Sequence, residues 1–186
     1  MKLKKINAVL SLLSILLLLM HLGYSVFAYF TFYYNPLLTK LFAVPFMVTV
    51  CLHAILGMSM VFLLPDGTRM DLYPRQNFRT ILQRVSAALI FPLLILHINT
   101  FDLLKACAAN GRRGLMILLF LSEPLFYGTV LTHTAVSLTR AFVTLGLLTS
   151  RDLMKRLDLI IYLICAAGFA AASWFVLKGQ IAMFMG

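Results

Sequence analysis

The sequence predicts an all-α membrane protein with five transmembrane helices. Of its 186 residues, 62% are hydrophobic and only 12% are charged, whereas soluble domains are about 45–50% apolar and about 25% charged. Five apolar stretches reach the roughly 20 residues that a helix needs to cross a bilayer. No polar stretch is long enough for a second domain, so residues 1–186 are expected to form a single transmembrane domain.

The five predicted spans are residues 6–30, 41–64, 81–101, 115–139 and 157–177. Lysines at positions 2, 4 and 5 imitate the start of a secretory signal, but the apolar run continues to residue 30, which favours a first span. Turn-forming residues separate the spans, at Asn35-Pro36, Pro65-Asp66-Gly67, Asn110-Gly111 and Ser150.

The net charge of +10 is attributed to lysines and arginines that anchor loop ends at the membrane surface, so no nucleic-acid partner is expected. Eleven basic residues lie on the side of the N-terminus: Lys2, Lys4, Lys5, Arg69, Arg75, Arg79, Arg84, Arg140, Arg151, Lys155 and Arg156. Five lie on the other side: Lys40, Lys105, Arg112, Arg113 and Lys178. Cytoplasmic loops carry the excess of Lys and Arg, so the N-terminus is predicted to lie inside. The hydrophilic loop at 65–80 is then the expected docking surface for a cytoplasmic partner.

Four histidines, His21, His53, His97 and His133, each lie in a different one of the first four spans. At about 1.5 Å of rise per residue, His53 and His133 lie about 16 and 10 Å from the inner ends of their spans. His21 and His97 lie about 20 Å from the inner surface. The histidines therefore form two pairs at two depths. The competing interpretation is four unrelated histidines, each hydrogen-bonded across a helix interface.

Two pairs of imidazoles at two depths can hold two haems, each between two histidines, and this predicts a four-helix bundle around two stacked haems that conducts electrons. Gly57, one turn after the second histidine, and Gly23 would leave room for a flat macrocycle, although close helix packing explains a membrane glycine equally well. Arg84 and Arg140 are candidates to bind haem propionates, with interfacial anchoring as the alternative.

These residues also resemble a known family. The run His53-Ala-Ile-Leu-Gly57, the run Leu82-Gln83-Arg84-Val85, His97 thirteen residues after that arginine, and His133 are similar to the membrane cytochrome b subunit of succinate:quinone oxidoreductases and quinol:fumarate reductases. The similar form has five helices, two haem b groups and a single anchor chain. The resemblance implies that His53 and His133 ligate the iron of the inner haem, and that His21 and His97 ligate that of the outer haem.

The resemblance further implies where the chain works and with what. Its partners would be a flavoprotein carrying FAD, where succinate and fumarate interconvert, and an iron–sulfur subunit, both on the cytoplasmic face. The chain would lie among the lipids of a prokaryotic cytoplasmic membrane and pass electrons to or from a quinone, by analogy menaquinone. Either direction of the reaction, and a dimer of the whole complex, are compatible with this assignment.

Quinone chemistry also needs groups that exchange protons. Glu123 and Asp102 are the acids expected near the outer haem, although a lone acid at a helix end is as often interfacial. Cys51, Cys107 and Cys165 are isolated, which excludes a cysteine-ligated zinc or iron–sulfur site. Two alternatives stay open: the haem-containing anchor of another quinone-linked dehydrogenase, and a haem-free membrane assembly or transport protein.

Overall fold

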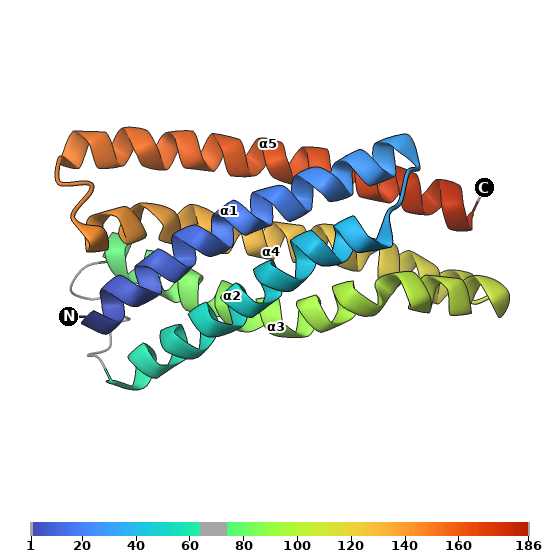
Figure 1. Ribbon diagram of the computed structural model, residues 1–186, viewed down its shortest axis with the longest axis horizontal. Coiled ribbons are helices and arrows are strands. Elements are labelled where there is room, and N and C mark those ends of the chain that lie inside the picture. The colour runs from blue at the N-terminus through green and yellow to red at the C-terminus, as the bar shows by residue number, and fades with distance from the viewer. Residues whose placement is uncertain (1, 64–73, 186) are drawn as a thin grey trace.

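The computed structural model describes residues 2–63 and 74–185, which form five α-helices. They are α1 (Lys2–Thr31), α2 (Pro36–Leu63), α3 (Pro74–Ala109), α4 (Arg113–Leu145) and α5 (Arg151–Phe184). All five contain a stretch long and apolar enough to cross a membrane. The helices run alternately up and down, and the two termini lie at opposite ends of the bundle (Figure 1). The predicted all-helical fold with five helices long and apolar enough to span a membrane is thus confirmed.

Each helix extends beyond its predicted span. The largest difference is in α3, which begins at Pro74 and ends at Ala109, against a predicted 81–101. A hydrophobic stretch ends where the hydrocarbon ends, whereas a helix continues until its backbone is capped. In α4 the cap is Gly146, whose φ is 78°. Its N–H donates to the carbonyl of Val143, and the N–H of Leu147 donates to that of Phe142. Of the predicted docking loop, residues 65–73 lie outside the described residues, and 74–80 form the start of α3.

The helices pack around α1 and α4. Helix α4 packs against α3 and α5, and α1 packs against α2, α4 and α5, while α2 makes close backbone contact chiefly with α1 within the described residues. The turn between α1 and α2 is held by Tyr24, whose hydroxyl accepts from the Asn35 N–H at 2.9 Å and donates to the Asn35 carbonyl at 3.0 Å. Helix α2 is therefore an edge helix attached mainly to α1.

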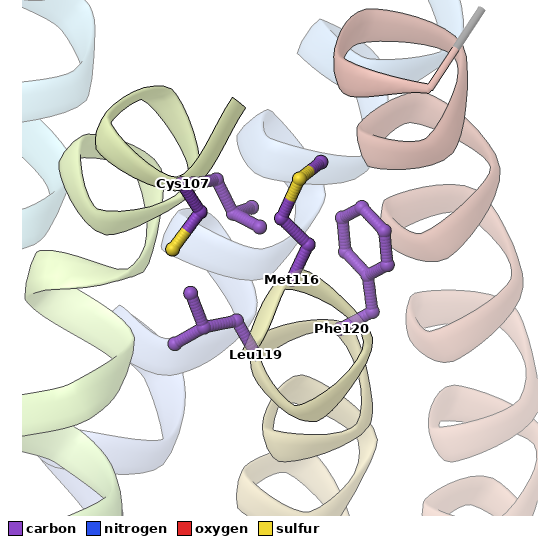
Figure 2. Close-up of a cluster of buried hydrophobic side chains, with 5 residues drawn as sticks. Cys107, Met116, Leu119 and Phe120 are labelled. Atoms are coloured by element: carbon purple, nitrogen blue, oxygen red, sulfur yellow. The ribbon is translucent and has the colours of Figure 1, made fainter. Parts of the chain in front are cut away.

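A cluster of buried hydrophobic side chains lies at the end of the bundle near the turn between α3 and α4 (Figure 2). It combines two residues of α3 with three of α4: Leu104, Cys107, Met116, Leu119 and Phe120. Partly buried side chains of α3 and α5 pack against it: Leu96, Leu177 and Phe184. Further along the bundle the buried side chains include polar ones, among them Thr100, Glu123 and Thr129. The polar interior adjoins the histidines.

Candidate functional site: the paired histidines

The four histidines lie on α1, α2, α3 and α4, one on each helix, and all four side chains are half-buried. We call His53 and His133 the inner tier, and His21 and His97 the outer tier, after their predicted depths. The structure brings the members of the inner tier together directly. Their ring centroids are 6.4 Å apart, with an angle of 67° between the ring planes. This contact joins α2 to α4 across the bundle.

The imidazole of His133 is oriented by α3. Its Nδ1 lies 3.1 Å from the backbone carbonyl oxygen of Gln83 and 3.2 Å from the hydroxyl of Ser86. Because the carbonyl can only accept, Nδ1 carries the proton in this contact, and Nε2 is left as the nitrogen with a free lone pair. The Nδ1 of His53 is buried and has no hydrogen-bond partner among the described residues. The inner tier thus has one oriented imidazole facing one with an unpartnered nitrogen.

In the outer tier, His97 contacts an acid instead of a carbonyl. Its Nδ1 lies 2.8 Å from Oε2 of Glu123 on α4. The hydroxyl of Tyr127 donates to the same oxygen at 2.5 Å. The ring of Phe126 stacks on His97 with 4.6 Å between centroids and 23° between planes. Helix α4 therefore fixes both the edge and one face of the His97 ring.

His21 completes the outer tier from α1. Its ring stacks on Phe46 of α2 with 5.9 Å between centroids. Its Nδ1 is buried and makes no hydrogen bond within residues 2–63 and 74–185. His21 and His97 are near enough to interact electrostatically, although their rings form no direct contact comparable to that of the inner tier.

A metal at this site would need ligands from outside the chain. Among the described residues, no group of three or more His, Cys, Asp or Glu side chains is arranged to hold a metal ion. Each tier offers two imidazoles, which is the number of axial positions on a haem iron, whose other four ligands come from the porphyrin. The donor set therefore suits a haem better than it suits a bare zinc ion, which is usually bound by three or four protein ligands.

The glycines predicted to make room for a macrocycle do lie beside open space. A Cβ added to Gly57 or Gly23 would meet no atom within 4 Å. By contrast, a Cβ on Gly179 would collide with the ring of Tyr29, and one on Gly128 would lie 3.3 Å from Phe169. Close helix packing thus accounts for Gly179 and Gly128 and leaves Gly57 without that explanation, whereas Gly23 is exposed, so the space beside it lies outside the bundle.

The two predicted propionate ligands lie near the inner tier. Arg140 Nη1 donates to the side-chain oxygen of Gln83 at 2.9 Å and to the hydroxyl of Thr80 at 3.2 Å. Arg140 also lines a pocket of about 370 Å³ between α3, α4 and α5. Arg84 is half-buried on α3. Gln83 therefore contacts both Arg140, through its side chain, and His133, through its backbone.

The two acids predicted near the outer haem have different surroundings. Glu123 is 2% exposed and, as described, contacts His97. The side chain of Asp102 is 88% exposed, and its nearest charged group is the ammonium of Lys105 at 3.9 Å. The structure thus places one acid within the bundle and the other on its surface.

The sequence analysis missed a polar cluster at the inner end. Asp158 lies in α5 and receives two hydrogen bonds of 2.8 Å from the guanidinium of Arg79 on α3. Thr139 of α4 donates to the same carboxylate at 2.5 Å, and Arg79 Nε donates to the Val136 carbonyl at 2.8 Å. The sequence offered one signal for this pair, because Arg79 and Asp158 both lie near the inner ends of predicted spans. The cluster ties together α3, α4 and α5.

Comparison with protein-family models, curated proteins and solved structures finds no match to this chain. The functional argument therefore depends on the residues and on their geometry alone.

Proposed function

We propose that the chain is the dihaem cytochrome b anchor of a succinate:quinone oxidoreductase or quinol:fumarate reductase. In this proposal it transfers electrons between the iron–sulfur clusters of a partner and a quinone in the membrane. The observation that carries the proposal is the approach of His53 and His133 from two helices across the bundle, with a second pair of histidines on the other two helices.

The inner tier has dimensions that fit a haem iron. With metal–nitrogen bonds of about 2 Å to two imidazoles on opposite sides, the ring centres would be separated by about 6 Å. The centroids of His53 and His133 are 6.4 Å apart. Each axial imidazole can rotate about its own metal–nitrogen bond, so an interplanar angle of 67° is acceptable. The unpartnered Nδ1 of His53 and the open space beside Gly57 support the same interpretation.

The outer tier fits a haem in its chemistry. The Nδ1 of His97 is held by a carboxylate, as the second nitrogen of a metal-bound histidine commonly is. The Nδ1 of His21 is buried without a partner in the described part of the chain. These features support a second haem between His21 and His97.

When bound, each haem supplies a site that accepts and releases one electron, and the chain's own residues supply the rest. His133 and His97 are held in fixed orientations by α3 and α4, respectively. The guanidinium of Arg140, near the His133 contact at Gln83, is the proposed partner of an inner propionate, and Arg84 is proposed for the same purpose.

Proton exchange with the quinone, which we propose to be menaquinone, is assigned to the outer end. Asp102 and Glu123 are the candidate groups. Asp102 is the better placed of the two, because its carboxylate is exposed, whereas the Glu123 carboxylate is buried and already accepts two hydrogen bonds. The partners, a flavoprotein with FAD and an iron–sulfur subunit, are proposed to dock on the side of the N-terminus, in a prokaryotic cytoplasmic membrane.

The decisive experiment is purification of the chain from membranes in mild detergent, followed by a pyridine haemochrome assay and identification of the co-purifying subunits. We expect two haems per chain, together with a flavoprotein and an iron–sulfur protein. A molybdenum or nickel subunit in place of the flavoprotein would support the anchor of a different dehydrogenase. The absence of haem from the purified complex would refute electron transfer and leave the assembly or transport alternative.

A further inference from the structure

The two tiers differ in the groups that contact the Nδ1 of His133 and the Nδ1 of His97. His133 Nδ1 contacts neutral groups, the Gln83 carbonyl and the Ser86 hydroxyl. His97 Nδ1 contacts a carboxylate, Oε2 of Glu123, at 2.8 Å. A carboxylate that accepts from a metal-bound imidazole fixes its tautomer and makes it a more basic ligand, whereas a carbonyl does so less strongly.

The cost of keeping Glu123 in its position indicates a function beyond packing. Its side chain is 2% exposed, within a membrane-spanning helix. A carboxylate buried in a low dielectric costs several kcal/mol unless it is paired and hydrogen-bonded. The described hydrogen-bond partners of this carboxylate are His97 and Tyr127, both at Oε2, and its buried Oε1 has none among the described residues. Of these two partners, His97 is the one that can carry a positive charge.

The ring of His97 is restrained on two sides. Glu123 fixes its Nδ1 edge, and the stacked Phe126 covers one face at 4.6 Å. Both residues belong to α4, three positions apart, so one helix face controls the orientation of the imidazole. Nε2 is then the nitrogen left for a ligand within the bundle.

We propose, on the basis of the dihaem function above, that Glu123 is a positioning residue for His97. In this role its carboxylate directs Nε2 toward the outer haem and selectively stabilises the oxidised state of that haem. Tyr127 weakens this effect, because its hydroxyl donates a hydrogen bond to the same oxygen of Glu123. The inner haem has no corresponding carboxylate on His133 among the described residues.

The test is a redox titration of the purified complex, combined with the low-spin ferric EPR spectrum of both haems. Glu123→Gln keeps the size of the side chain and an oxygen that can accept from His97, but removes the charge. We expect it to raise the midpoint potential of one haem only. The expected change is about tenfold in the ratio of reduced to oxidised haem at fixed potential, which is about 59 mV for one electron. The EPR signal of the same haem should shift, and that of the other should not.

Two further variants sharpen the test. Tyr127→Phe removes the competing donor and leaves more of the carboxylate charge for His97, so the same haem should shift by a smaller amount in the opposite direction. Asp152→Asn removes an equal charge from an acid that is exposed, in the first turn of α5. It should leave both midpoints unchanged. If Glu123→Gln fails to assemble, Tyr127→Phe still decides the question, because it alters Glu123 without removing it.

The outcomes separate this inference from the proposed function. Two haems whose midpoints and EPR signals do not respond to Glu123→Gln or Tyr127→Phe would overturn the positioning role and leave the dihaem assignment intact. Equal shifts of both haems, or an equal shift with Asp152→Asn, would overturn it too, because they would indicate a general effect of charge. A wild-type complex without haem would overturn the proposed function itself.

Discussion

The pairing of Arg79 with Asp158 should stabilise the inner end of the bundle by a measurable amount. Two unit charges about 4 Å apart attract by about 4 kcal/mol at the effective dielectric constant of about 20 found near protein surfaces. Desolvation opposes part of this gain, since the two side chains are only 22% and 21% exposed. Exposed pairs contribute about 0–1 kcal/mol, and breaking a buried pair costs about 3–5 kcal/mol. We therefore expect a coupling free energy of about 2 kcal/mol, roughly thirtyfold in the folding constant.

A double-mutant cycle measures this coupling. Arg79→Met, Asp158→Asn and the double variant would be unfolded reversibly in mixtures of SDS and mild detergent. The transition can be followed by the fluorescence of Trp174, the single tryptophan of the chain. Thr139→Val is the matched variant, because it removes one uncharged donor from the same carboxylate and should cost about 1.5–3 kcal/mol. A coupling below about 0.5 kcal/mol would show that the two charges gain no more than they lose on desolvation, and would refute the reasoning.

Three further predictions concern the glycines, the histidines and the turn between α1 and α2. Gly179→Ala should destabilise the fold by about 1–3 kcal/mol in the same unfolding assay, because its Cβ would overpack against a tyrosine ring of α1; Gly114→Ala, with nothing within 4 Å, should not destabilise it. His133→Ala and His97→Ala should each lower the haem content from two to one, with different EPR signals lost; loss of the same signal from both would contradict the two-tier assignment. Tyr24→Phe leaves the Asn35 N–H without its partner, while the Asn35 carbonyl still accepts from Thr39. The loss should cost about 1–3 kcal/mol, so an unchanged unfolding midpoint would contradict this function of the hydroxyl.

The number of helices could be predicted from the sequence, but their ends could not. The length of an apolar stretch reflects the thickness of the bilayer core. It does not predict how many polar residues continue the helix into the interface. Helix α3 illustrates this point, because it continues for eight residues beyond the predicted end at 101, through the polar Asp102 and Lys105, to Ala109. Its end depends on the local turn at Gly111, whose φ is 65°, which no count of apolar residues contains.

The depth of each site residue in the bundle could be predicted from the sequence, but the direction in which its helix presents it could not. Rise per residue assigned His53 and His133 to one level, and their rings do lie 6.4 Å apart. The same calculation put Glu123 near the outer tier, but it could not predict that the carboxylate faces His97, because this depends on how α3 and α4 are rotated about their axes. The pairing of Arg79 with Asp158 was missed for the same reason, since 79 positions separate the two residues.

The edge position of α2 has a consequence for what a group held by the inner tier would connect. Within the described residues α2 packs chiefly on α1, whereas α3, α4 and α5 are joined at Asp158. A group bound by both His53 and His133 would therefore join the edge helix to the other part of the bundle.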